Sequence, residues 1–314
     1  MLGKTLKKRK WRRSSYVVSV RVYRSGGSET EKGLSRKHVV ESCSYSLERL
    51  GLAYVDLVCA QGRDRTPVEE IVRAFNWVIE KGWAFYWTTS NWTPEQVMEA
   101  FTVAKYLNLI PPLVNHAEYN FFKRDAVELV VPELLCNIGC GCVTSSALHG
   151  GLLNIDSAID GPSEQSDDPT TKAHPKAMEV NLEHREFFSK IKYLLPVADQ
   201  ISCSLAQLAI AWCLRSEFVQ CVLISPVNLE QMREYMISVA IIDKLTPEVL
   251  AVVEKILGNQ PTFNTNSMTK AKLTTKNSIY GRRRSVCSVV RRILFFEFAA
   301  RTVCQCILFA VWSA

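Results

Sequence analysis

Short apolar runs that alternate with amphipathic helical stretches constrain the fold of this chain more than any other feature. Each run has the length of a strand, and most are apolar on both faces, as is typical of buried parallel strands. We predict strands at Tyr16–Val22, Tyr54–Ala60, Trp83–Thr89, Leu113–Ala117, Cys140–Thr144 and Cys221–Ser225. Their alternation with helices at a spacing of about 30 residues predicts βαβ units and a parallel sheet.

The predicted helices begin with recognisable capping residues. Thr66-Pro67-Val68-Glu69 predicts a capping box with proline in the first turn, and Thr93-Pro94-Glu95-Gln96 repeats the pattern. Related signals stand at Ser204, Asn228 and Thr246. Pro196 falls inside the predicted helix Glu186–Ile201, where it is expected to kink the helix or cost about 3 kcal/mol.

Two architectures accommodate such a sheet: an open doubly wound sheet and a closed (β/α)8 barrel. No G-x-G-x-x-G motif follows the first apolar run, which argues against the dinucleotide-binding open sheet. We therefore predict an α/β fold of the (β/α)8 TIM-barrel kind. Such a barrel closes with eight strands, whereas six runs are found and Lys4–Arg13 leads directly into the first of them. The expectation is a barrel that is missing its first strands and exposes two sheet edges.

Two regions are predicted along the chain: an incomplete barrel over residues 1–261 and a divergent basic and hydrophobic tail over residues 262–314. Within the barrel, residues 150–185 are rich in Gly, Ser, Asp and Pro, which predicts a long loop over one face. In the tail, Ile293–Ala314 is apolar but is interrupted by Glu297, Arg301 and Gln305. The uninterrupted remainder is too short for a transmembrane span, which leaves a segment lying on a membrane surface or an irregular extension.

The formal net charge of +7 collects in Lys4–Arg13 and Arg282–Arg292, at the two ends. The central body is nearly balanced, so no nucleic-acid-binding domain is predicted. None of the eleven cysteines shows the paired C-x-x-C spacing of a zinc site, and no metal site is predicted. No signal peptide opens the chain, so free thiols in a cytoplasmic protein are expected.

Several segments resemble one known family. They are Trp11-Arg-Arg-Ser-Ser15, Gly33-Leu-Ser-Arg-Lys-His38, Asn108-Leu-Ile-Pro-Pro112 and Gln207-Leu-Ala-Ile-Ala-Trp-Cys-Leu-Arg215. Together they resemble the beta subunit of Shaker-type voltage-gated potassium channels, a branch of the aldo-keto reductases, and the similarity runs from about Leu2 to about Pro261. The resemblance implies a (β/α)8 barrel that binds NADP(H) at the carboxyl ends of its strands.

The same resemblance implies a partner and a role. Family members form a homo-tetramer docked on the cytoplasmic face of a channel alpha subunit, reduce aldehydes weakly, and influence channel inactivation, expression or surface delivery. The implied role is a cytoplasmic regulatory subunit that is peripheral to the plasma membrane through the channel.

The resemblance also implies a catalytic set that is altered here. The family uses an Asp and a Tyr after the second barrel strand, a Lys on the third and a His or Asn on the fourth. This chain begins after the Asp and Tyr segment, and Arg21 and Gln61 stand at the Lys and His/Asn positions. Arginine keeps the charge but not the compact ammonium, and glutamine reaches further than asparagine. Lost catalysis is therefore expected, with Arg21 facing a solvent-filled gap left by the missing strands.

The implied cofactor positions are eroded as well. Asn91 follows Ser90 where the family has Arg, and His116 replaces a Gln that contacts the nicotinamide. Ser225-Pro-Val-Asn228 replaces a Gly-Ala-Ser-Asn phosphate loop, and Tyr235 replaces an Asn. The candidate cofactor-binding residues are Gln61, Ser90, Asn91, His116, Ser146, Leu148, Gln231 and Glu234. We expect NADP(H) binding that is weak or lost, and we interpret His116 as a structural histidine.

Two alternatives to the regulatory subunit stay open. One is a working NADPH-dependent aldo-keto reductase acting on aldehydes or ketones, which would need a longer natural amino terminus. The other is a defective or mispredicted product, whose unusual ends come from a faulty gene model.

Overall fold

The computed structural model describes residues 2–23, 28–62, 64–154, 182–261, 293–298 and 306–310. Six parallel strands lie within one residue of the predicted runs, which confirms the parallel sheet. They are β1 (Tyr16–Val22), β2 (Val55–Gln61), β3 (Ala84–Ser90), β4 (Val114–Glu118), β5 (Gly141–Ser145) and β6 (Cys221–Ile224).

The two sheet edges are paired rather than open. Strand β7 (Ile293–Phe298) runs parallel to β6, and β8 (Cys306–Ala310) runs antiparallel to both β7 and β1. The eight strands close a barrel in chain order. The expectation of exposed edges is therefore wrong, because the apolar runs of the tail satisfy the edge N–H and C=O groups of β1 and β6. The predicted region boundary at residue 261 stays a prediction.

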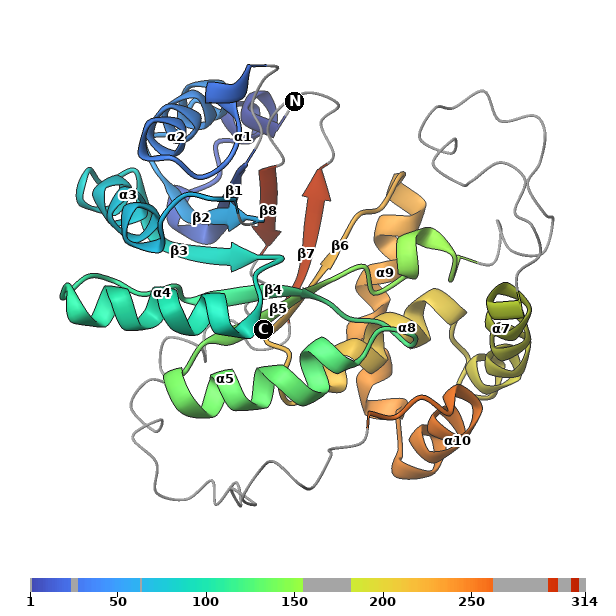
Figure 1. The fold of residues 1–314 in the computed structure, drawn as a ribbon. Coiled ribbons are helices and arrows are strands. Elements are labelled where there is room, and N and C mark those ends of the chain that lie inside the picture. Colours follow the sequence, from blue (N-terminus) through green and yellow to red (C-terminus); the bar gives the residue numbers. More distant parts are fainter. Residues whose placement is uncertain are drawn as a thin grey trace.

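The helices surround the strands (Figure 1). Along the first half of the chain they are α1 (Leu2–Arg9), α2 (Arg36–Leu50), α3 (Val68–Glu80), α4 (Pro94–Tyr106) and α5 (Val131–Ile138). Along the second half they are α7 (Leu182–Gln200), α8 (Leu205–Arg215), α9 (Leu229–Ile241) and α10 (Pro247–Leu257). The predicted loop over residues 150–185 lies mostly outside the described residues.

Most of the predicted caps are confirmed. Thr93 and Ser204 form reciprocal capping boxes with the glutamine three residues later, and the Asn228 side chain accepts from the backbone N–H of Gln231. The capping box at Thr66 is wrong: α3 begins after Pro67 without a side-chain cap. Before this helix, the Asp64 carboxylate accepts a hydrogen bond from the backbone N–H of Thr66 at 3.0 Å.

Helix α7 continues through Pro196, and the expected kink or energetic cost at this residue stays a prediction. Leu194 and Val197 flank the proline and are buried in the core, and their burial offsets the lost hydrogen bond. Among the described residues, no single helix is long and apolar enough to cross a membrane. In that described part of the chain, one pair of helices, Glu186–Gln200 and Leu205–Arg215, bent by 85°, has sufficient length and apolar content when taken together.

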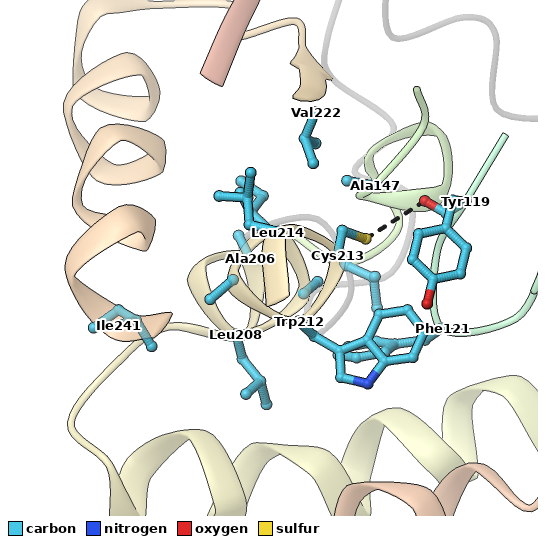
Figure 2. Packing of buried hydrophobic residues seen from close by; sticks show 14 of the residues in the cluster. Tyr119, Phe121, Ala147, Ala206, Leu208, Trp212, Cys213, Leu214, Val222 and Ile241 are labelled. Atoms are coloured by element: carbon cyan, nitrogen blue, oxygen red, sulfur yellow. Dashed lines mark hydrogen bonds between the residues drawn. The ribbon is translucent and has the colours of Figure 1, made fainter. Parts of the chain in front are cut away.

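Two large apolar clusters lie between the strands and the helices. One packs α1 to α4 against β1 to β3, and the other surrounds α8, the most buried helix (Figure 2). In the second cluster the Trp212 ring stacks on Tyr119 at 4.9 Å and tilts against Phe121 at 5.1 Å. A third, small cluster of Val114, Val143, Cys221 and Leu223 lies on the inner face of the strands. Polar side chains replace it towards the carboxyl ends of the strands.

Candidate functional site

The carboxyl ends of β2, β3 and β4 bring three of the predicted site residues into one row. Gln61 pairs in register with Ser90, and Ser90 pairs with His116. Arg21 on β1 lies opposite Cys59, one step below that row on the same inner face. The carboxyl end of the strands is the edge at which (β/α)8 barrels hold their active sites. We refer to Arg21, Gln61, Ser90 and His116 as the barrel mouth.

His116 is the centre of the barrel mouth. Its side chain is buried, its Nε2 atom lies 3.3 Å from the hydroxyl of Thr88, and its Nδ1 atom has no hydrogen-bond partner among the described residues. Burial, and then the positive charge of Arg21, lower the pKa of His116 to about 3. The imidazole is therefore neutral at physiological pH. The interpretation of His116 as a satisfied structural histidine holds for one ring nitrogen only.

Arg21 does not face an open gap. Strand β8 pairs with β1 from Tyr16 to Val20, which occupies the side of β1 where missing strands were expected. Arg21 is half-buried, and its charge acts on His116. The solvent-filled gap predicted at this residue is therefore wrong, because the tail supplies the neighbouring strand.

The remaining predicted cofactor residues before α9 are held mainly through their backbones. Asn91 follows β3 with a φ of 58°, in the left-handed region that asparagine tolerates. Ser146 follows β5 with a φ of 60°, and its carbonyl oxygen accepts hydrogen bonds from the Asn120 side chain and the His149 backbone. Leu148 is half-buried against the cluster around α8. Ser146 and Leu148 follow β5, so they lie outside the row of Gln61, Ser90 and His116.

Gln231 and Glu234 lie on α9, outside the strands, and both are engaged within the chain. The Gln231 Oε1 atom accepts the backbone N–H of Val227 at 3.0 Å, which folds the side chain back over the start of its own helix. The Glu234 carboxylate accepts a short hydrogen bond from the Ser204 hydroxyl. Tyr235 is buried, and its hydroxyl bonds to the Asn154 side chain at 2.8 Å. This bridge ties α9 to the segment after β5.

The residues at the start of α9 fit the phosphates of NADP(H) poorly. Pro226 has no N–H group to donate, and the N–H of Val227 is already bonded to Gln231. The barrel mouth fits better, since the His116 Nδ1 atom is a polar group without a partner among the described residues. Among the described residues, the barrel mouth therefore fits NADP(H) better than the start of α9 does.

Sequence reasoning missed Thr88, the hydroxyl partner of His116. The signal was present, because side chains alternate along a strand and Thr88 is two residues before Ser90 on the same face. Among the described residues, no group of three or more His, Cys, Asp or Glu side chains is arranged to hold a metal ion.

One family comparison bears on this geometry. The model of the aldo/keto reductase family matches residues 1–257, which is most of the chain. The match agrees with the parallel strands of a (β/α)8 barrel and with polar residues gathered at their carboxyl ends. The chain belongs to the aldo/keto reductase family.

Proposed function

We propose that this chain is a regulatory subunit of a Shaker-type voltage-gated potassium channel and has lost hydride-transfer catalysis. The observation that carries the loss is the protonation state of the barrel mouth. Carbonyl reduction needs a general acid whose pKa lies near the working pH. An arginine side chain does not give up its proton in proteins, and His116, with a pKa of about 3, stays neutral near pH 7.

The other two residues of the barrel mouth do not fill this role. Gln61 and Ser90 are not acids in the neutral range. The carboxylate two residues further along β4, Glu118, is paired with Lys123 at 2.7 Å. The poor fit at the start of α9 separately supports weak or lost NADP(H) binding as part of the proposal.

The channel partner has a separate basis. It rests on the resemblance carried by segments such as 11–15, 33–38, 108–112 and 207–215, several of the resembling segments being specific to the channel beta subunits rather than to reductases at large. The family match supports the reductase ancestry and no more. A homo-tetramer on the cytoplasmic side of the channel is the assembly that this resemblance suggests. The regulatory effect would then depend on docking surfaces and not on turnover.

The test is a paired assay on the purified chain. One arm measures NADPH oxidation with an aromatic aldehyde, and the other measures co-purification with the cytoplasmic amino-terminal domain of a Shaker-type channel. We expect no aldehyde-dependent oxidation by the parent chain, by Arg21→Lys or by Gln61→Asn. All three should co-purify with the channel domain equally well, because Arg21 and Gln61 lie on the inner face of the strands.

Each arm has an outcome that overturns its half of the proposal. Aldehyde-dependent NADPH oxidation by the parent would favour the alternative hypothesis of a working reductase. Micromolar or tighter NADPH binding in a fluorescence titration would refute the weakened cofactor site. Failure of the parent to co-purify would remove the channel partner.

A further inference from the structure

The amino ends of the first strands carry a dense group of exposed cations. Lys4, Lys7, Lys8, Arg9, Lys10 and Arg12 are all exposed, and they occupy α1 and the turn that follows it. The sequence contains no acidic residue before Glu29. None of these cations forms an ion pair with another residue that the structure describes. Their positive potential is therefore not neutralised locally.

Helix α1 is a fixed part of the protein surface. Leu6 is buried in the apolar cluster under α2, and Leu2 packs against the same cluster. Gly3 lies so close to the backbone of Leu50 that an added Cβ atom would fall 2.5 Å from the Leu50 carbonyl oxygen. The apolar side of α1 is thus used for docking onto α2, and the opposite side presents the cations.

Exposed aromatic rings adjoin the cations. Trp11 is 51% exposed and contacts Tyr16 edge-on at 6.5 Å, and Phe85 is 53% exposed and contacts Tyr54 edge-on at 5.0 Å. The Arg13 guanidinium joins the two pairs, since it lies 5.0 Å from the Tyr16 ring and 4.0 Å from the Tyr54 ring. Arg13 is itself neutralised by Asp56 at 2.6 Å. The rings therefore form one connected group beside the free cations.

We propose that this basic and aromatic surface binds the anionic face of a lipid bilayer. Lysine and arginine near a negatively charged leaflet each add to the attraction, and tryptophan and phenylalanine rings partition into the headgroup region. A nucleic acid is the less suitable partner. Base stacking needs free ring faces, whereas Arg13 lies over the rings of both Tyr16 and Tyr54. This inference does not depend on the channel role.

The test uses the full chain and vesicle co-sedimentation. We expect binding to phosphatidylcholine vesicles that contain about one third phosphatidylserine, and no binding to pure phosphatidylcholine. Raising the salt from roughly 0.1 M to 1 M should release the protein, because the screening length shortens from about 10 Å to about 3 Å. Binding that is equal on neutral vesicles or insensitive to salt would overturn the proposal.

A matched pair of variants locates the surface. Lys7→Gln/Lys8→Gln/Arg9→Gln removes three charges and keeps good helix formers in α1. We expect its apparent affinity for the anionic vesicles to fall on the order of a hundredfold. The control Lys192→Gln/Arg233→Gln/Lys255→Gln removes three exposed charges from α7, α9 and α10 and should bind as the parent does. Equal losses in both variants would mean that net charge, not this surface, drives binding.

Two further measurements separate the alternatives. Trp11→Ala should weaken vesicle binding measurably, but less than the triple variant does. An unchanged affinity of Trp11→Ala would show that the Trp11 ring does not contribute to membrane binding. Tighter binding to a single-stranded oligonucleotide than to the anionic vesicles, at equal salt and lost in the same triple variant, would assign the surface to nucleic acid instead. Circular dichroism spectra that match the parent's ensure that lost binding does not reflect an unfolded α1.

Discussion

Two buried polar groups in this molecule are built in opposite ways. Arg124, after β4, is 5% exposed and donates hydrogen bonds to both Glu128 and Glu254, with a further bond to Asn259. By contrast, His116 at the barrel mouth has one ring nitrogen without a partner among the described residues, and the hydroxyl of Ser19, two residues before Arg21 on β1, has none among them either. The first group is saturated with partners, and the second is not.

The difference separates a structural role from an inherited site. Arg124 joins the segment after β4 to α10 and to the end of that helix, and its guanidinium also lies 5.1 Å from the Trp212 ring. Its partners stabilise the fold, and a buried charge without them would be very costly. At the barrel mouth, by contrast, the buried Nδ1 atom of His116 has no hydrogen-bond partner among the described residues. Unsatisfied buried polar atoms are typical of binding and catalytic sites, and this family places its active site here.

The strongest way to test this contrast is to remove the central cation. Arg124→Met should destabilise the protein by about 3 kcal/mol, because two carboxylates lose their partner. This loss of stability is at the low end for buried ion pairs, since the side chains of Glu128 and Glu254 are still 19% and 28% exposed. Urea denaturation followed by circular dichroism measures the change.

The neighbouring residue provides the control. Lys123 pairs with Glu118 at 2.7 Å, but the two side chains are 57% and 38% exposed. Lys123→Met should therefore cost less than about 1 kcal/mol. Equal losses in Arg124→Met and Lys123→Met would show that the Arg124 cluster is not a special determinant of stability.

The pH dependence of stability tests the barrel mouth. The pKa of His116 in the folded protein, about 3, is below its usual value of 6.5. Its contribution to stability is therefore complete above pH 6.5 and is lost as the pH falls towards 3. Between about pH 7 and about pH 5 the parent should lose about 2 kcal/mol more than His116→Gln does.

Comparing the stability loss of the parent with that of His116→Gln removes the effect of the other titrating groups. His38 and His149 also have lowered pKa values, chiefly through burial, and they titrate in both proteins. Urea titrations at several pH values supply the two stability curves. Parallel curves would mean that His116 is accessible to protons in the folded state, and the proposed absence of a general acid would then lose its basis.

The sequence predicted the six parallel strands because each apolar run is local and continuous. It did not predict barrel closure, because β8 pairs with β1 across nearly the whole chain and Glu297, Arg301 and Gln305 interrupt the apolar pattern of the tail. No local periodicity reports a pairing between such distant segments. The capping box at Thr66 failed for a local reason, since Asp64 accepts a hydrogen bond from the backbone N–H of Thr66 that Glu69 was expected to bond.

The row of Gln61, Ser90 and His116 could be predicted, because strand ends in a parallel barrel meet at one edge. The engagement of Gln231 by Val227 and of Glu234 by Ser204 could not. These bonds depend on how one side chain folds over a turn and on how α8 approaches α9. The resemblance identified both residues as cofactor contacts, whereas the structure gives each a partner within the chain.

The smallest expected effect is a gain in stability, whereas Arg124→Met is expected to lower it. Ser19 is completely buried on β1, two residues before Arg21, and its hydroxyl has no hydrogen-bond partner among the described residues. A buried hydroxyl without a partner costs free energy, and alanine removes it with little change of volume. Ser19→Ala should therefore stabilise the protein, by about 0.5–1 kcal/mol in urea denaturation.

The control for this substitution is a buried hydroxyl that does have a partner. Thr89 is also fully buried, and its hydroxyl donates to the Asn115 side chain at 2.8 Å. Thr89→Val keeps the shape but leaves the Asn115 oxygen without its donor, so it should destabilise by about 1–2 kcal/mol. If Ser19→Ala were as destabilising as Thr89→Val, the Ser19 hydroxyl must be satisfied in solution. The contrast between a saturated structural cluster and an unsaturated barrel mouth would then not extend to β1.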